Sequence, residues 1–431
     1  MSTTKVLLLG SGGRESALAW ALARSASTSE LVAAPGNAGI AEFAAIEPAR
    51  VLDAAGAVAV ATRVQPDLVV IGPEAPLVAG AGDALRERGF AVFGPDASAA
   101  RVEGSKTHAK ELMERAGIPA TRWGSFTSPD DAIAFADELG PPYVIKADGL
   151  AAGKGVVVTS ERAEATAAIR AALVEGRFGE AGQRVVVEEF LDGEELSLIA
   201  FSDGANLLAC EPAQDFKRAL DGDKGPNTGG MGSYSPVPSC PPSEAERIAD
   251  DLLRPMLKTI AEEGAPFVGA LYAGLALTTK GPRVVEFNAR FGDPETQALV
   301  PRLRSDLAAI CLACASGDLS GTRLEWSPDR CVTVVLAAGG YPGPHSSGLP
   351  IEGLDDAASL PGVYLFHAGT AVENGRLVTA GGRVMAVSAL GPSLKAARSA
   401  AYHAVSKISF PHMHFRTDIA ARAASIEGST P

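Results

Sequence analysis

The chain has few cysteines and no long apolar run. Its five cysteines among 431 residues are odd in number and scattered, which disfavours a disulfide framework and favours reduced thiols. Cys311 and Cys314 form a C-x-x-C pair in an apolar helical stretch, but no second cysteine or histidine pair lies near them, which disfavours a redox or metal role. No stretch reaches the roughly 20 uninterrupted apolar residues of a membrane helix, and Met1 leads directly into an apolar strand pattern. We therefore expect a cytoplasmic protein that does not bind membranes.

Basic residues are in the minority. The sequence has 38 Lys and Arg residues against 51 Asp and Glu residues, so its formal net charge is −13. This charge disfavours nonspecific binding to nucleic acid, and no nucleic-acid partner is expected. Any anionic ligand must therefore be held by local donors.

The length predicts several domains, because 431 residues exceed what one hydrophobic core usually organises. Alternating patterns predict a doubly wound α/β domain over residues 1–104, with strands at 6–9, 31–34, 68–71 and 91–93 and helices near 17–23 and 81–88. Residues 105–325 follow, and they begin with a helix that Ser105 caps and Gly117 ends. Within them, residues 120–195 alternate strand, Gly-rich loop, strand, helix and strand, which favours a lid subdomain.

The rest of the chain predicts a helix over residues 244–262, an antiparallel pair of strands over 271–278 and 283–287, and a mostly β domain over 326–431. That last domain has strand patterns at 332–337, 363–366 and 384–389, a hairpin turn at 374–375 and a final helix near 394–408. Residues 424–431 carry no core pattern, and we expect them to be disordered.

The first glycine-rich loop, residues 10–15, follows a strand and opens a helix. Its backbone N–H groups and the helix dipole can hold a phosphate, although the glycines would also suit a tight turn with no ligand. A dinucleotide site would require glycine at Glu15 and an acid near Asn37, so NAD is not expected. The loops at Asn37 and Glu74 favour a small phosphorylated substrate, because they lie at the carboxyl ends of neighbouring strands.

A second glycine-rich segment joins two apolar strands. Lys146 ends the first strand, ADGLAAGKG spans residues 147–155, and three valines follow Gly155. A Walker loop would require Ser or Thr after Lys154 and then a helix, so we predict instead a flexible hairpin flap over the phosphates of a nucleotide, as in the ATP-grasp fold. An unpaired ammonium on an apolar strand is costly, so we interpret Lys146 as a phosphate ligand rather than a surface lysine.

A polar strand end follows the pattern VVEFNAR at residues 284–290. Its two-residue period places Glu286, Asn288 and Arg290 on one face. Glu286 and Asn288 offer hard oxygen ligands for Mg²⁺ on nucleotide phosphates, and Arg290 can neutralise a carboxylate and its acyl phosphate; a purely structural polar face is the alternative. Two polar loops, residues 214–218 and 225–232, extend this set, although a glycine-rich surface turn would look similar.

With these segments in place, the whole chain resembles the phosphoribosylamine–glycine ligase (glycinamide ribonucleotide synthetase) family of the ATP-grasp superfamily. The resemblance rests on GSGGRE at 10–15, APGNAG at 34–39, GPEAPL at 72–77, KADGLAAGKGV at 146–156, EEFLDGEE at 188–195, DGDKGPNTGGMG at 221–232, EFNARFGDPE at 286–295, AGGYPG at 338–343, HAGT at 367–370 and TAGGR at 379–383. It implies ATP-dependent ligation of glycine to 5-phosphoribosylamine through a glycyl phosphate in purine biosynthesis, with Mg²⁺ or Mn²⁺ as the metal.

The resemblance also implies roles for particular residues. The metal ligands would be Glu286 and Asn288, and the catalytic residues would be Arg290, Asp215 and Lys217. The residues expected to bind ATP are Lys106, Lys146, Gly153, Lys154, Gly155, Glu188, Glu189, Leu191 and Glu195. Those expected to bind the other substrates are Gly10, Gly12, Gly13, Arg14, Asn37, Glu74, Asn227, Thr228, Gly229, Gly230, Met231 and Asp293.

Three positions depart from the family pattern: Ser16 and Phe216 replace frequent histidines, and Ala289 replaces a frequent valine. Neither histidine can therefore be the general base, and Asp215, a phosphate oxygen or water stays open for that role.

The alternatives to the glycine ligase are another ATP-grasp ligase or carboxylase, and a noncatalytic nucleotide-sensing module. The sequence leaves the oligomeric state open, with a monomer as the simplest expectation.

Overall fold

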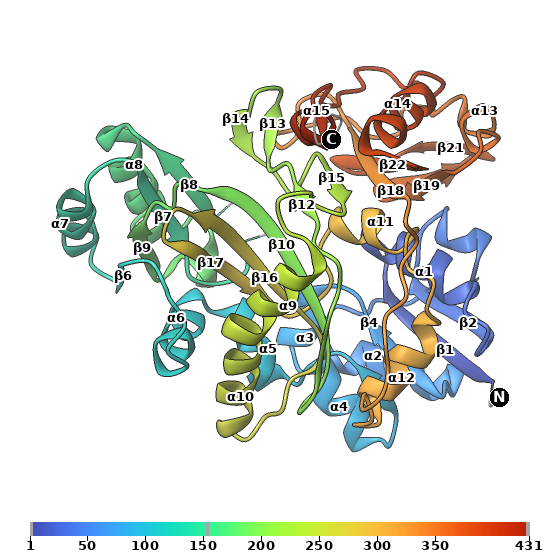
Figure 1. Cartoon of the computed structure of the whole chain (residues 1–431), viewed down its shortest axis with the longest axis horizontal. Helices are drawn as coiled ribbons and strands as arrows, with labels where there is room; N and C mark the ends of the chain where they lie inside the picture. Colours follow the sequence, from blue (N-terminus) through green and yellow to red (C-terminus); the bar gives the residue numbers. More distant parts are fainter. Residues whose placement is uncertain (1–2, 152–154, 428–431) are drawn as a thin grey trace.

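A computed structural model describes residues 3–151 and 155–427 of the chain. Figure 1 shows an N-terminal body, a central body from which a lid projects, and a C-terminal body that packs beside the first. The predicted fold class is confirmed: a doubly wound α/β unit, an ATP-grasp unit with a lid, and a C-terminal unit built on a β-sheet.

The N-terminal body is a five-stranded parallel sheet in the order β3-β2-β1-β4-β5, because buried apolar runs such as VLLL at residues 6–9 can be covered by helices on both faces. Sequence analysis missed α2, α3 and α5. The strands are β1 (Thr4–Gly10), β2 (Thr28–Pro35), β3 (Ala45–Ile46), β4 (Leu68–Ile71) and β5 (Ala91–Phe93). The helices are α1 (Gly13–Ala23), the 3₁₀ turn η1 (Ile40–Glu42), α2 (Ala54–Val64), α3 (Glu74–Val78), α4 (Ala81–Glu87) and α5 (Ala97–Gly104).

The lid is an antiparallel sheet in the order β6-β9-β7-β8, and the helix before it, α6 (Lys106–Arg115), has the predicted cap, since Ser105 Oγ accepts the His108 N–H at 3.2 Å. The helix α7 and the strand β6 were not predicted. The elements are β6 (Trp123–Phe126), α7 (Pro129–Leu139), β7 (Tyr143–Ala147), β8 (Val156–Thr159), α8 (Arg162–Leu173), η2 (Gly179–Gly182) and β9 (Val185–Glu189).

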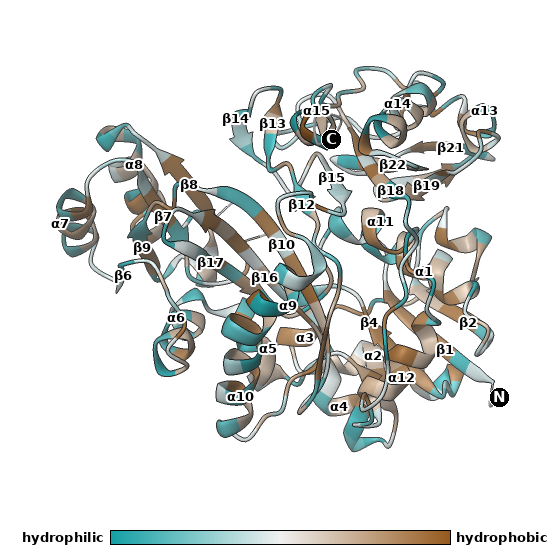
Figure 2. Ribbon diagram, viewed as in Figure 1, coloured by the Kyte–Doolittle hydropathy of each residue, from teal (hydrophilic) through white to brown (hydrophobic). Residues whose placement is uncertain are grey.

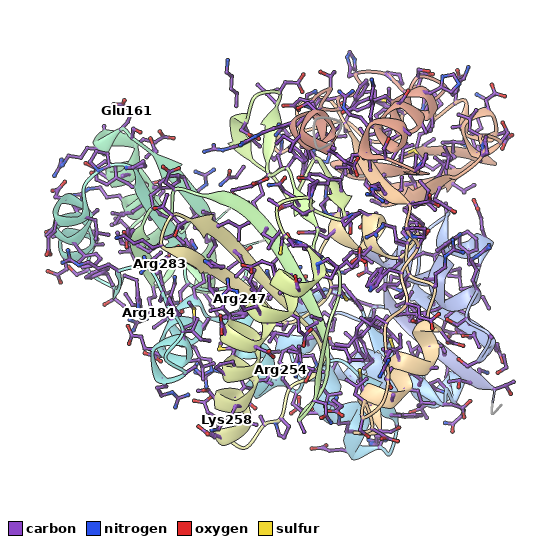
Figure 3. The ribbon with its side chains drawn as sticks, viewed as in Figure 1. Glu161, Arg184, Arg247, Arg254, Lys258 and Arg283 are labelled. Atoms are coloured by element: carbon purple, nitrogen blue, oxygen red, sulfur yellow. The ribbon has the colours of Figure 1, made fainter. Side chains whose placement is uncertain are left out.

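The central sheet, in the order β11-β10-β16-β17, contains the predicted antiparallel pair and the unpredicted long strand β10. Its strands are β10 (Glu194–Asp203), β11 (Leu207–Ala209), β16 (Val268–Thr278) and β17 (Gly281–Asn288). The predicted helix 244–262 is continuous but contains a π-helical segment, as α9 (Pro242–Ile248), η3 (Ala249–Leu253) and α10 (Arg254–Glu262). Arg247, Arg254 and Lys258 lie along this helix, with side chains 42% to 80% exposed (Figure 3).

The C-terminal sheet has the order β12-β15-β18-β22-β19, so it takes two strands from residues before 325. These elements are β12 (Gln214–Asp215), β15 (Gly232–Ser235), β18 (Arg330–Ala337), β19 (Val363–His367) and β22 (Arg383–Gly391), with the hairpins β13 (Arg218–Leu220) to β14 (Lys224–Asn227) and β20 (Thr370–Glu373) to β21 (Arg376–Thr379). The helices are α11 (Glu295–Leu299), α12 (Leu307–Ala315), α13 (Leu354–Ala358), α14 (Leu394–Val405) and α15 (Ala421–Glu427).

Two predictions about this region have opposite outcomes. The hairpin turn is confirmed, because Asn374 and Gly375 have positive φ angles between β20 and β21. The expected disorder from residue 424 is wrong up to Glu427, because α15 continues to that residue and Glu427 Oε1 lies 2.6 Å from Arg330 Nε. Residues 428–431 lie outside the described residues.

Buried apolar residues form two clusters that run through all three bodies, the larger from Leu7 through Leu271 to Val387, and a smaller third cluster in the lid. Figure 2 shows apolar residues along the central strands and on α12, and polar residues on the outer surface of α9 and α10. All five cysteines are free and buried, including Cys311 and Cys314 on α12. Across residues 3–151 and 155–427, no helix has both the length and the apolar character needed to cross a membrane.

Candidate active site

Two adjoining cavities lie where the bodies meet. One, of about 880 Å³, lies between the lid and the C-terminal residues 416–426, and we call it the lid cavity. The other, of about 320 Å³, receives Arg14, Arg290 and Arg383, and we call it the arginine cavity. Both volumes fall in the range of small-molecule sites. The residues lining both cavities are Lys146, Val156, Asp215, Lys217, Thr228, Val285 and Glu286.

At the inner end of the lid cavity, two lysines share one buried carboxylate. Lys146 on β7 and Lys110 on α6 both pair with Glu188 on β9, the second at 2.5 Å. Thr121 completes the group, since its hydroxyl accepts from Lys110 Nζ at 2.8 Å and donates to Glu188 Oε2 at 2.9 Å. Burial alone would raise the pKa of Glu188, but the Lys146 and Lys110 ammoniums outweigh it and lower the pKa to about 2.

This group corrects one premise of the sequence analysis. Lys146 has partners within the protein, so its burial does not by itself indicate a phosphate ligand. Its Nζ also donates to the Val285 carbonyl at 3.1 Å and thereby ties the lid to β17. ATP binding by Lys146 stays a prediction, and it now requires the ammonium to contact phosphate beside Glu188.

Lys106 opens α6 and reaches into the arginine cavity. Its Nζ donates to the Gly149 carbonyl at 3.1 Å, at the base of the predicted flap. Burial lowers the pKa of the Lys106 ammonium, while the Glu286 carboxylate opposes that change. A half-buried cation whose hydrogen bonds, among the described residues, go to the Asp148 and Gly149 carbonyls suits an anionic ligand.

The wall between the cavities carries acidic groups close to a lysine. Lys217 Nζ lies 2.8 Å from Glu195 Oε2 on β10. Burial would lower the pKa of Lys217, but the Asp215 and Glu195 carboxylates outweigh it and raise the pKa. Burial, helped by the charges of Glu295, Glu195 and Glu286, raises the pKa of the Asp215 carboxyl to about 8, although Lys217 opposes the rise. A carboxyl with such a pKa can take up and release a proton near neutral pH.

Glu286 and Asn288 pair with Gly274 and Tyr272 in a regular stretch of the β16–β17 ladder, so they share one face of the strand, as predicted, and both line the arginine cavity. Arg290 differs, because β17 ends at Asn288 and Arg290 lies two residues beyond it, although it reaches the same cavity. Burial would raise the pKa of Glu286, but Lys217, Lys146 and Lys106 outweigh it and lower the pKa. Glu286 is thus ionised among cations.

The donor set at this strand end fits a hard divalent cation. A carboxylate and an amide oxygen are ligands that Mg²⁺ accepts, and Mg²⁺ in nucleotide sites usually takes one or two carboxylates and completes its shell with phosphates and water. Within the described part of the chain, no group of three or more His, Cys, Asp and Glu side chains is arranged to hold a metal ion. With one carboxylate and one amide oxygen, Glu286 and Asn288 are suited to a metal whose other ligands are phosphate and water.

Arg290 is held by acids from the N-terminal body. Its Nη2 lies 2.8 Å from Glu103 Oε1, at the end of α5, and its Nε lies 3.4 Å from Glu74 Oε2, at the start of α3. Arg14 joins the same group through Glu74 at 3.8 Å and donates to the Phe291 carbonyl at 3.0 Å. The arginines of two bodies thus meet around shared carboxylates.

Arg383 brings the C-terminal body into the same cavity. Its Nη1 donates to the carbonyls of Gly229 at 2.7 Å and Asp293 at 2.8 Å, and its Nη2 lies 3.2 Å from Asp293 Oδ2. The Tyr341 hydroxyl accepts the Gly229 N–H at 3.0 Å. Tyr341 and Arg383 lie in two of the sequence motifs, but no role was predicted for either of them or for Glu103.

Two backbone N–H groups of the first glycine loop already have hydrogen-bond partners within the protein. Glu15 Oε2 accepts the Gly12 N–H at 2.6 Å, as the Glu of a capping box does, and Asp293 Oδ2 accepts the Arg14 N–H at 3.3 Å. These two N–H groups are therefore not free for a phosphate, contrary to the sequence interpretation. Asn37 is also used internally, because its amide donates to the carbonyls of Ser11 and His367.

The predicted residues divide between the cavities. Met231 is fully buried, and its N–H and carbonyl both bond to the backbone, so it packs in the core rather than meeting a ligand. The predicted residues at the lid cavity are Lys146, Glu188, Glu189, Leu191, Glu195, Asp215, Lys217, Asn227, Thr228 and Glu286. The arginine cavity adds Arg14, Glu74, Lys106, Gly155, Gly229, Asn288, Arg290 and Asp293; Gly10, Gly12, Gly13, Asn37, Gly230 and Met231 line neither, and Gly153 and Lys154 lie outside the described residues.

Two of the departures from the family pattern have structural roles. Ser16 is buried, and its hydroxyl accepts the His367 N–H at 3.1 Å, which fastens α1 to β19. The ring of Phe216 lies 4.9 Å from the Arg416 guanidinium carbon and packs near Tyr234. Neither position provides an acid or base.

Known protein families and relatives match this chain over nearly its whole length. Three models of phosphoribosylglycinamide synthetase match it: the N domain over residues 4–103, the ATP-grasp (A) domain over 104–296 and the C domain over 331–422. The phosphoribosylamine–glycine ligase of Streptomyces coelicolor is 50% identical over 423 residues, which are 97% of this chain and 99% of that protein. The ligase of the same name from Leifsonia xyli is 51% identical over 97% of this chain and 100% of its own length.

Two solved structures are also similar to this chain. The crystal structure of a phosphoribosylamine–glycine ligase from Thermotoga maritima has a TM-score of 0.83 and 35% identity, and the match covers 96% of this chain and 100% of that one. The biotin carboxylase domain of a Hydrogenobacter thermophilus 2-oxoglutarate carboxylase has a TM-score of 0.73 at 18% identity, over 96% of this chain and 92% of that domain. The second likeness concerns the fold alone.

Proposed function

The chain belongs to the phosphoribosylglycinamide synthetase family, and from this premise we propose that it joins glycine to 5-phosphoribosylamine while ATP is converted to ADP and phosphate. The product is glycinamide ribonucleotide, an intermediate of purine biosynthesis, and the reaction takes place in the cytoplasm. One observation supports this most: Glu286 and Asp215 lie in the wall shared by a cavity large enough for a nucleotide and a smaller one rich in arginine.

ATP would occupy the lid cavity, with its phosphates directed toward the shared wall. Lys146 provides positive charge in that wall, and Lys106 provides it from the arginine cavity. Residues 188–191, at the end of β9 and just after it, line the lid cavity. Glu286 and Asn288 would hold Mg²⁺ or Mn²⁺, both of which accept oxygen ligands. When bound, the metal neutralises charge on the phosphates and orients them for transfer.

Glycine would lie in the arginine cavity, with its carboxylate near Arg290. An unactivated carboxylate reacts poorly with an amine because an oxide ion is a poor leaving group. Transfer of the terminal phosphoryl group of ATP to a carboxylate oxygen gives glycyl phosphate, from which phosphate can leave. Arg290 is placed to stabilise the negative charge that develops on that oxygen, since its guanidinium is fixed and always protonated.

The amine of phosphoribosylamine must lose a proton when it attacks the glycyl phosphate. Asp215 is our candidate for the base because it lines both cavities and burial raises its pKa to about 8. Lys217, which the same wall keeps protonated, would balance the charge left on phosphate. A phosphate oxygen or water is the alternative base.

We further propose that one chain is enough for activity, because the residues lining its two cavities include the groups proposed to hold ATP, the metal and the glycine carboxylate. Light scattering of the active enzyme tests this: a monomer at assay concentration agrees with it, and activity confined to a dimer fraction contradicts it.

A coupled assay of ADP release tests the proposed reaction. We expect release to require glycine, phosphoribosylamine, ATP and a divalent metal together, with one glycinamide ribonucleotide formed per ADP. Bicarbonate should not replace glycine. ADP release with bicarbonate, or with another amine in place of phosphoribosylamine at an equal rate, would instead favour a different ATP-grasp carboxylase or ligase.

A further inference from the structure

Glu103 reaches from the N-terminal body to the end of the strand that carries the proposed metal ligands. It is the penultimate residue of α5, and its side chain extends to the residues that follow β17. Its Oε2 accepts the Ala289 N–H at 2.8 Å, and its Oε1 pairs with Arg290 Nη2 at 2.8 Å. One carboxylate therefore holds both the backbone and the arginine immediately beyond Asn288.

Both groups that Glu103 contacts are hydrogen-bond donors. Only a carboxylate offers two acceptor oxygens at that spacing, whereas an amide offers one acceptor and one donor. Glu103 is also 8% exposed, and burial raises the pKa of its carboxyl against the opposing charge of Arg290. The sequence therefore keeps a desolvated acid where an apolar side chain could fill the space.

A buried ion pair is weak evidence for a role in stability, because well-packed apolar residues often serve as well or better. The surroundings of Glu103 favour a role in geometry. It lines the arginine cavity together with Glu286, Asn288 and Arg290. Within the described residues, Arg290 Nη1 donates to the Phe291 carbonyl at 3.1 Å, while Nε has the Glu74 ion pair but no hydrogen bond.

The contacts of Arg290 thus fix its guanidinium without using all its donors. Glu103 and the Phe291 carbonyl each contact one terminal nitrogen, and each of these nitrogens carries a second N–H, while Nε is buried 3.4 Å from Glu74 Oε2. A guanidinium held in this way keeps one direction of approach to a carboxylate. The fixed geometry depends on the acid from the N-terminal body.

From these contacts we propose that Glu103, Ala289 and Arg290 form a clamp in which Glu103 is a positioning residue: it sets the orientation of Arg290 and of the strand end that presents Asn288 during phosphorylation of the glycine carboxylate. This inference rests on the proposed function, because it assigns Glu103 through the roles of Arg290 and Asn288. The clamp also makes the N-terminal body part of the phosphoryl-transfer site as well as part of the substrate site.

The variant Glu103→Gln tests the clamp. Glutamine replaces one of the two acceptor oxygens with an NH₂ donor, so Arg290 and the strand end should shift, and misplacement of about 1 Å can reduce turnover roughly 100-fold. We expect kcat to fall by about that factor, while the dissociation constant for ATP, measured by calorimetry, stays close to that of the wild type.

The matched control is Glu211→Gln. Glu211 pairs with the buried Arg302 at 2.6 Å, and neither residue lines a cavity. This variant should lower the unfolding temperature and leave kcat within about twofold of the wild type, as expected for a change remote from a site. If Glu103→Gln lost kcat and ATP affinity in parallel, or kept more than half of its kcat, the clamp would be overturned.

A second variant guards against loss of folding. Glu103→Asp keeps the charge but is one methylene shorter, so it can reach one donor better than both, and its kcat should lie between those of the wild type and Glu103→Gln. Full activity in Glu103→Asp would count against the clamp. A wild type that formed no product would overturn the proposed function, whereas an active wild type with an active Glu103→Gln variant would overturn the clamp alone.

Discussion

The lid cavity and the arginine cavity hold positive charge in different ways. Beside the lid cavity, Lys146 and Lys110 share the single carboxylate of Glu188, although Lys110 itself lines the arginine cavity. In the arginine cavity, the guanidiniums each contact acids and backbone carbonyls, as Arg290 does with Glu103 and Phe291. A lysine ammonium is a point charge on a flexible stem, whereas a guanidinium is a rigid fork.

The two arrangements suit different tasks: the lysine suits binding of the nucleotide, and the arginine suits a fixed position in the transition state. A lysine that shares a carboxylate can exchange one anion for another when a nucleotide enters or leaves, and Lys146 has that arrangement. An arginine fixed at two nitrogens keeps its orientation whether a ligand is present or not, which favours stabilisation of charge that appears only in the transition state. Each prediction below tests this difference or the wall that the two cavities share.

The largest effect should come from Glu286→Ala, which removes a proposed metal ligand from the shared wall. Loss of a residue that only supports a metal ligand can cost 10- to 100-fold in activity, so loss of the ligand itself should lower kcat by more than about 100-fold. Circular dichroism and the unfolding temperature should stay close to those of the wild type. Turnover within tenfold of the wild type at saturating Mg²⁺ would remove Glu286 from the metal site.

The second effect is a pH dependence that Asp215 imposes. A base must be deprotonated to act, so kcat/KM should rise with pH and level off above the Asp215 pKa of about 8. A single group with that pKa is about 1% deprotonated at pH 6, so the wild type should gain roughly 50-fold between pH 6 and pH 8.

Asp215→Asn is the control for that profile. It should lower kcat/KM at pH 8 and remove the rise, since the amide does not titrate in this range. If the variant retained the same rise, the titrating group would be phosphate or the amine itself, and Asp215 would lose its assignment.

A smaller effect, confined to the lid cavity, should follow from Lys146→Met. Removing one charged hydrogen bond costs about 1.5 kcal/mol or more, so the KM for ATP should rise about tenfold while the KM for glycine changes less. Lys258→Met is the matched control, because Lys258 is 80% exposed on α10 (Figure 3) and should have no effect on either KM. Equal increases in the KM values for ATP and glycine would contradict the assignment of the two substrates to different cavities.

Sequence patterns predicted those parts of the site that lie on one continuous segment. The alternation in VVEFN placed Glu286 and Asn288 on one face, because the two-residue period of a strand fixes side-chain direction. Part of the lining of the lid cavity comes from two runs, 188–195 and 214–218, which the sequence patterns had singled out. The parallel N-terminal sheet was also predicted, since its strands are uninterrupted apolar runs.

What the sequence did not reveal depends on contacts between distant segments. Glu103 and Arg290 are 187 positions apart, and nothing in the local pattern around either residue predicts that they meet. The partner of Lys146 was missed for the same reason, because Glu188 comes from another strand of the lid. The bond from the Gly12 N–H to Glu15, by contrast, is local and could have been predicted. Glu15 stands three residues after Gly12, as the Glu of a capping box does, but the glycines of the loop were taken to indicate a phosphate site.

The central claim is that the two cavities meet so that the carboxylate of glycine is phosphorylated before the amide bond forms. If so, one oxygen of that carboxylate must leave with the transferred phosphoryl group. The complete reaction with ¹⁸O-carboxyl glycine, followed by mass spectrometry of the released phosphate, tests this directly. The account predicts one ¹⁸O atom in each phosphate formed from fully labelled glycine, and unlabelled phosphate together with normal product formation would contradict it.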